Sequence, residues 1–211
     1  MGGAEDQGAD GEAEAILALG ITAACPRYVR RRWYNWDAPQ EINVTRREAV
    51  AVVGSDTPAA MENARELGRL LAEEGWVVLS GGRDAGVMKA VSEGAKQVPG
   101  SLTIGILPTA ASKVAPGVDV AIVTDMGNAR NNIVGLSSCV VIACGVDGPG
   151  TASEVALALK NQKHVILLGA STAAVEFFRE LDAQNKLFLA STPADAIRIV
   201  KQNGLCRQRP A

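Results

Sequence analysis

Short runs of consecutive aliphatic residues recur along most of the chain, and a glycine, proline or serine closes most of them. Ala49–Val53 is the first run, and Cys139–Cys144 and His164–Leu168 have the same character. A strand that is apolar at every position is typical of a sheet with both faces covered. We therefore expect buried strands at 49–53, 76–79, 102–107, 118–123, 139–144, 164–168 and 187–190.

Segments with helical periodicity separate these runs. Between residues 58 and 74, Ala60, Ala64, Leu67 and Leu71 share one face at a spacing of three or four. Further helices are expected at 85–97, 128–138, 151–160, 173–183 and 193–203. Strands that alternate with helices predict an α/β fold, a single Rossmann-like, doubly wound parallel sheet with helices on both faces, over residues 46–205.

Composition fits this class and excludes others. The 211 residues are 47% hydrophobic and 21% charged, which is the balance of one globular domain. Lys and Arg number 21 against 23 Asp and Glu, so the net charge of −2 argues against binding nucleic acid by bulk charge. No apolar run approaches the ~18 residues that a membrane span needs.

The cysteines and the histidine carry little of the expected chemistry. Cys25, Cys139, Cys144 and Cys206 form no CxxC pair, so neither a zinc site nor a disulfide framework is expected. A reducing compartment, the cytoplasm, is the natural location. We interpret Cys144 as part of the apolar core, with a position beside the ligand as the alternative. The single histidine, His164, is interpreted as structural.

The first 45 residues differ from the remainder. Residues 1–20 are acidic and rich in Gly and Ala, and they match neither a signal nor a transit peptide, so residues 1–45 are expected to form a flexible, disordered N-terminal extension. Arg30–Trp36 combines arginine with aromatic residues. Such a segment suits an arm that packs on the domain or on another subunit, or less often a stacking surface for single-stranded nucleic acid.

Glycines gather in the loops after three of the expected strands, at Gly54, at Gly81–Gly82 and between 145 and 150. Ligands of parallel sheets bind at the carboxyl ends of the strands, and glycine lets backbone amides approach an anion at a helix N-terminus. These loops favour a phosphate-bearing small molecule, although glycine is also common in such turns. GxGxxG and GxxxxGK[ST] are both missing, so neither a dinucleotide fingerprint nor a P-loop is expected.

Three segments carry a family resemblance: Ser80–Ala95, Gly105–Pro108 and Gly148–Glu154. They resemble the Rossmann-type superfamily that contains the Lonely Guy phosphoribohydrolases, often labelled "lysine decarboxylase-like". Within it, the chain is most similar to the molybdenum cofactor carrier proteins, through GPGTASE, the Leu-Ala-Leu-Lys160 that follows, Val165–Gly169 and Phe177–Ala183. The resemblance covers about residues 50–200.

The carrier resemblance implies a protein that binds, protects and transfers molybdenum cofactor (molybdopterin) to cofactor-dependent apo-enzymes without catalysing a reaction. It also implies a homo-oligomer, a tetramer or a dimer, for which the helices at 58–74 and 128–138 offer interfaces. The hydrolase resemblance implies the alternative, a nucleoside 5′-monophosphate phosphoribohydrolase in which Arg130 and Glu154 are catalytic. Hydrolases carry PGGxGTxxE, whereas Val146-Asp147-Gly148 stands here in place of PGG, which favours the carrier. No lysine suits a Schiff base, so PLP-dependent decarboxylation is not expected.

The expected ligand-binding residues lie in the glycine-rich loops and in the Asn-rich segment after residue 127. No metal ligand is expected, and a carrier needs no catalytic residue. Thr151 and Glu154 also match a capping box, and a surface charge is the alternative interpretation of Arg83 and Arg130. The site residues are Gly54, Ser55, Gly81, Gly82, Arg83, Asn128, Arg130, Asn131, Gly148, Gly150, Thr151 and Glu154.

Overall fold

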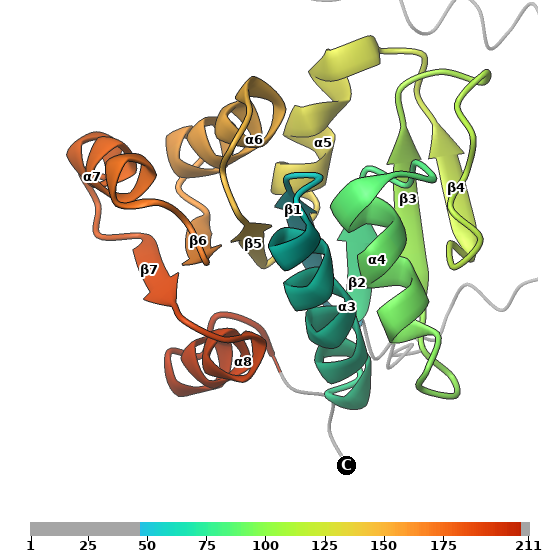
Figure 1. Cartoon of the computed structure of the whole chain (residues 1–211), viewed down its shortest axis with the longest axis horizontal. Helices are drawn as coiled ribbons and strands as arrows, with labels where there is room; N and C mark the ends of the chain where they lie inside the picture. The colour runs from blue at the N-terminus through green and yellow to red at the C-terminus, as the bar shows by residue number, and fades with distance from the viewer. Residues whose placement is uncertain (1–46, 208–211) are drawn as a thin grey trace, which may run out of the picture. The chain divides into compact units, whose positions relative to one another are not determined.

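The computed structural model describes residues 47–207, and these residues form one seven-stranded sheet (Figure 1). All neighbouring strands are parallel, in the order β4-β3-β2-β1-β5-β6-β7. The expected α/β fold class is confirmed. The strands are β1 (Ala49–Gly54), β2 (Val77–Ser80), β3 (Thr103–Leu107), β4 (Val120–Val123), β5 (Val140–Cys144), β6 (His164–Leu168) and β7 (Leu187–Ala190).

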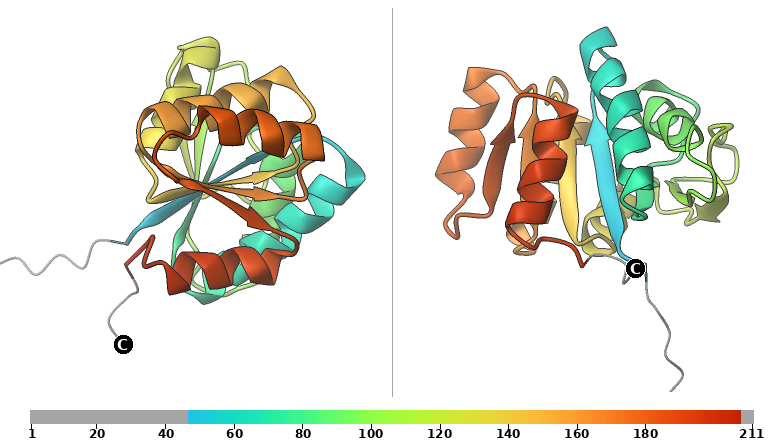
Figure 2. Two further views of the ribbon diagram at one scale, coloured as in Figure 1. Left: turned by 90° about the vertical axis from the view of Figure 1, so that its left-hand side faces the viewer. Right: turned by 90° about the horizontal axis from the view of Figure 1, so that it is seen from below.

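Helices cover both faces of the sheet, as the edge-on view shows (Figure 2). One layer holds α3 (Pro58–Glu73), α4 (Gly86–Ala95) and α8 (Pro193–Gln202). The other layer holds α5 (Asn131–Leu136), α6 (Pro149–Lys160) and α7 (Thr172–Leu181). Within residues 47–207, none of the helices has the length and apolar character of a membrane span.

Strand β1 shows why a central strand is apolar at every position. Val50 and Val52 belong to the core under α3, α4 and α8, whereas Ala51 and Val53 belong to the core under α5, α6 and α7. All four side chains are buried, because alternate residues of a strand point to opposite faces. A continuous aliphatic run therefore marks a central strand of a sheet with two covered faces.

Three sequence expectations need correction. Strand β4 is not buried, since all four of its residues are exposed at the sheet edge. The helix expected at 128–138 is instead a 3-10 turn, Gly127–Arg130, followed by the short helix α5. The apolar face of α3 packs on α4 and the sheet, so it is not free to serve as an interface. The N-terminal extension at 1–45 and the Arg30–Trp36 segment lie outside the described residues.

The expectation that no disulfide is present is also wrong for the described residues. Cys139, just before β5, and Cys206, after α8, form a disulfide. They are 67 residues apart in sequence, and a CxxC search finds only close pairs. The bond attaches the segment after α8 to the amino end of the central strands, where Arg207 N–H also donates to Glu48.

We expect Cys139→Ser to lower the free energy of unfolding by about 2–4 kcal/mol under oxidising conditions, because the open chain gains conformational freedom when it unfolds. Urea denaturation of both proteins, with and without reductant, measures this. Reductant should lower the stability of the native protein to that of the variant. Equal stability of the native protein in both conditions would contradict the prediction.

Candidate functional site

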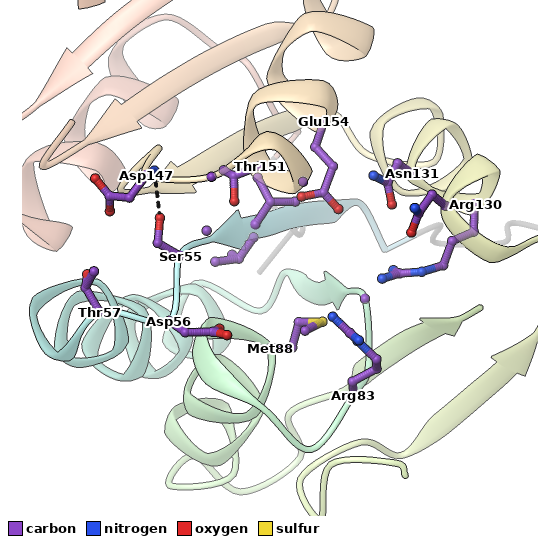
Figure 3. Close-up of a pocket in the computed structure, with 17 residues that line it drawn as sticks. Ser55, Asp56, Thr57, Arg83, Met88, Arg130, Asn131, Asp147, Thr151 and Glu154 are labelled. Carbon is purple, nitrogen blue, oxygen red and sulfur yellow. Dashed lines mark hydrogen bonds between the residues drawn. The ribbon is translucent and has the colours of Figure 1, made fainter. Parts of the chain in front are cut away.

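A cavity of about 530 Å³ lies at the carboxyl ends of β1 and β5 (Figure 3). The chain runs from β1 outward to β2, β3 and β4 on one side, and from β5 to β6 and β7 on the other. The loops after β1 and β5 therefore diverge and leave a crevice, which is where doubly wound sheets bind ligands. The volume is that of an ordinary small-molecule site.

Ser55 joins the two diverging loops. Its backbone N–H donates to the Cys144 carbonyl over 3.1 Å, and its Oγ accepts from Asp147 N–H over 3.0 Å (Figure 3). Since Ser55 Oγ accepts in the second bond, its own hydroxyl proton stays available to an acceptor in the cavity. The serine both holds the crevice together and offers it a donor.

The N-terminus of α6 opens onto the cavity without a side-chain cap. Gly148 is the N-cap residue, Pro149 is the first helical residue, and Thr151 lies inside the helix. The capping-box interpretation of Thr151 and Glu154 is therefore wrong. A Cβ placed on Gly148 or Gly150 would meet nothing within 4 Å. The amides of the first helical turn, which have no intrahelical partner, thus face open space that an anion can enter.

Arg130 is a buried arginine at the end of the 3-10 turn. Only 6% of the residue is exposed, and its Nε and Nη1 have no hydrogen-bond partner among the described residues. Its guanidinium lies over Gly81, where a Cβ would come within 2.5 Å of Nη1 and within 2.6 Å of Met88 Sδ. Burial lowers the pKa of Arg130 from its ordinary value, yet a guanidinium stays charged. A buried charge with unused donors calls for an anionic partner.

Arg83 approaches from the opposite wall and is more exposed (Figure 3). The residue forms an isolated β-bridge with Val114, and the Asp84 N–H next to it donates to the Lys113 carbonyl over 2.9 Å. The Asp84 carboxylate also binds Lys113 Nζ over 2.6 Å. The loop after β3 therefore fixes the backbone that carries Arg83.

Glu154 lies on α6 and faces the two arginines across the cavity (Figure 3). Burial raises the pKa of its carboxyl to about 7, although the charges of Arg130 and Arg83 act in the opposite direction. No ion pair joins Glu154 to either arginine among residues 47–207, so the guanidiniums remain open to a ligand. The carboxyl can therefore be protonated or ionised near neutral pH.

Eleven of the twelve expected site residues line this cavity, and Gly82 does not. Gly82 has a φ of +70°, and a Cβ there would lie 2.7 Å from Gly105 Cα, so it serves the packing of the loop on β3. Ligand contact by the eleven stays a prediction. Sequence reasoning missed Val52, Val53, Asp56, Thr57, Met88 and Asp147. Asp56 and Thr57 follow Ser55 directly, so the carboxyl end of β1 was the signal that pointed to them.

Cys144 and His164 do not line the cavity. Cys144 is fully buried in the core under α3, and burial raises the pKa of its thiol to about 12. Its thiol is therefore unreactive near neutral pH. His164 is half-buried at the start of β6, the opposite end of the strand from the cavity. Burial and then Lys186 lower its pKa.

The raised pKa of Glu154 predicts a pH dependence of stability. Folding raises the pKa from 4.5 to about 7, so the folded protein binds more protons between these pH values. Stability from this group is present below pH 4.5 and is lost as the pH rises through about 7, by up to roughly 3 kcal/mol. Glu154→Gln removes this loss. Between pH 5 and pH 8, the free energy of unfolding measured by denaturation should fall more for the native protein than for the variant. Equal falls in the two proteins would contradict the prediction.

The comparison with known sequences gives the family. The profile of the SLOG cluster4 family matches residues 47–197. The chain belongs to the SLOG cluster4 family. An uncharacterized protein of Archaeoglobus fulgidus is 45% identical to this chain over 105 residues, which are 50% of this chain and 68% of that protein.

Two solved structures are similar to this chain in both sequence and fold. The molybdenum cofactor binding protein of Rippkaea orientalis is 51% identical with a TM-score of 0.72, and the match covers 75% of this chain and 98% of that one. The molybdenum cofactor carrier protein of Chlamydomonas reinhardtii is 46% identical with a TM-score of 0.69, over 74% and 98%. The resemblance to carrier proteins found in the sequence is confirmed.

Proposed function

We propose that this chain binds molybdenum cofactor in the cavity between β1 and β5, protects it, and hands it to cofactor-dependent apo-enzymes without altering it chemically. The similarity to two proteins named as binding or carrying this cofactor supports the proposal, because it extends over nearly their whole length. Molybdopterin is an anionic ligand that bears a phosphate, a dithiolene and a pterin.

The buried guanidinium of Arg130 is the observation that carries this proposal. A folded protein avoids a buried cation with unused donors unless a partner completes it, and Arg130 lines the cavity. Arg83 adds a second positive charge from the other wall, and the amides at Gly150 and Thr151 add uncharged donors. A ligand with two anionic groups can use both sets.

Glu154 favours a second candidate, a phosphoribohydrolase. A buried carboxyl with a pKa of about 7 suits a general acid at a glycosidic bond, and Arg130 faces it. The change from PGG to Val146-Asp147-Gly148 at the start of the loop counts against this candidate. In a carrier, the same carboxyl lines the ligand cavity and takes no part in a reaction.

Two measurements test the function. Mass spectrometry and metal analysis of protein purified from a molybdenum-replete host should find the pterin cofactor bound. Under anaerobic conditions, Glu154→Gln should retain cofactor binding, and neither protein should release free base from adenosine or cytokinin monophosphate. Base release that is lost in Glu154→Gln would show the hydrolase instead.

A homo-oligomer is part of the same proposal. Val120, Ile122, Val123 and Met126 expose 43–51% of their surfaces on β4 and just after it, which supports a subunit contact at this edge. Light scattering of the purified protein should give the mass of a dimer or a tetramer. A monomer at micromolar concentration would contradict this part of the proposal.

A further inference from the structure

Acidic residues line the end of the cavity away from the two arginines. Asp56, Thr57 and Asp147 gather with Ser55 at one end, and Arg83 and Arg130 lie at the other (Figure 3). The N-terminus of α6 lies between the two groups. The cavity therefore offers acceptors at one end and cationic donors at the other.

The Asp56 and Asp147 carboxylates have no donor among residues 47–207, unlike most aspartates of this part of the chain. Asp84 and Asp119 pair with lysines, Asp182 accepts from backbone amides, and Asp195 pairs with Arg198. Both residues are exposed, so water solvates these carboxylates in the free protein. They can accept hydrogen bonds from the other end of a ligand whose anionic groups bind Arg130.

Two glycines and one backbone hydrogen bond shape the surroundings of these carboxylates. Gly86, with a φ of +49°, leaves room for the Asp56 carboxylate at the start of α4. Asp147 Oδ2 and Ser55 Oγ both flank Gly145, at 2.9 and 3.2 Å from the position of a Cβ there. The hydrogen bond from Asp147 N–H to Ser55 Oγ holds the Asp147 backbone beside β1. The backbone of Asp147 is thus held in place before a ligand arrives, and the lack of a Cβ at Gly86 admits the Asp56 carboxylate.

We infer that Asp56 and Asp147 bind the donor edge of a 2-amino-4-oxopyrimidine ring, and that the ligand lies with its anionic groups toward Arg130. This inference rests on the proposed function and extends it to the orientation of the pterin. The exocyclic amine and the adjacent ring N–H form a pair of parallel donors that a carboxylate accepts together. An adenine ring lacks this pair, so the acidic end selects against adenylate ligands.

The test uses two phosphorylated probes and four proteins. Neopterin monophosphate carries the donor edge and a phosphate, whereas ribose 5-phosphate carries the phosphate and hydroxyls only. Calorimetry compares the native protein with Asp56→Asn, Asp147→Asn and the control Asp125→Asn. Asp125 is also exposed and without a donor among the described residues, but it does not line the cavity.

At least one cavity variant should lose ~10- to 100-fold in affinity for neopterin monophosphate, because a charge-assisted hydrogen bond is lost. Ribose 5-phosphate should bind unchanged or more tightly, and Asp125→Asn should match the native protein. Equal losses for both probes would mean that the acids bind hydroxyls, and a loss of native binding in EDTA would mean that they hold a divalent cation. Each of these results would overturn the inference.

The inference and the proposed function can fail separately. If the native protein binds molybdenum cofactor and both cavity variants bind neopterin monophosphate like the native protein, the orientation is wrong and the function stands. If the native protein binds neither compound, the function itself is wrong. Thermal melts of all four proteins identify a variant that fails to fold, and Asp147→Ser then replaces it.

Discussion

Gly150→Val should abolish cofactor binding while the protein still folds. Gly150 is the second residue of α6, and a Cβ there has no atom of the described chain within 4 Å outside its own helical turn, so the fold leaves room for a side chain. Its side chain fills the space in front of the helix amides, and an anion can no longer reach them. We expect a loss of at least ~100-fold in affinity, the equivalent of two or more charge-assisted hydrogen bonds.

Ala194→Val is the matched control for this change. Ala194 follows Pro193 at the start of α8, as Gly150 follows Pro149 at the start of α6, and it is exposed and outside the cavity. Fluorescence titration with isolated cofactor under anaerobic conditions should give native affinity for this control. Native affinity in Gly150→Val as well would mean that the anion does not bind at this turn.

Arg130→Met should weaken binding and stabilise the ligand-free protein. Methionine fills a similar volume without a charge, so the variant avoids the cost of a buried guanidinium whose Nε and Nη1 have no partner. We expect the free energy of unfolding to rise by about 1–3 kcal/mol and the affinity for cofactor to fall ~10- to 100-fold at pH 7. Denaturation without ligand and anaerobic titration measure the two effects.

Arg198→Met provides the control, because Arg198 is an exposed arginine of α8 that pairs with Asp195. Its stability should change by less than about 0.5 kcal/mol, and its binding should not change. If Arg130→Met binds cofactor like the native protein, the buried arginine is structural and the proposed function loses its main support.

The sequence predicted the central strands best, because burial leaves a clear pattern there. The expected limits of β6 and β7 agree with the structure, and those of β1 and β5 differ by one residue at one end. The pattern could not show that β4 lies at an edge, since Val120 and Ile122 are as apolar as core residues. Strand order depends on contacts between distant segments, which local periodicity does not record.

The site was predictable where a loop follows a central strand, and less so where function depends on packing. Glycine marked the loops at Gly54 and Gly148, but it also marked Gly82, whose role is the close approach to Gly105. The sequence did not predict Asp56 and Asp147 as site residues, because a carboxylate is not expected beside a bound phosphate of the same charge. The burial of Arg130 results from the fold around it, which sequence spacing does not reveal.

The hydrogen bonds of Ser55 have a consequence for how quickly a ligand can enter and leave. Because Ser55 ties the loop after β1 to the loop after β5, the two walls of the cavity are assembled before binding. Little backbone then has to be ordered when a ligand arrives, so association is limited mainly by diffusion and orientation. The lifetime of the complex is then set by the ligand's own contacts with the two walls.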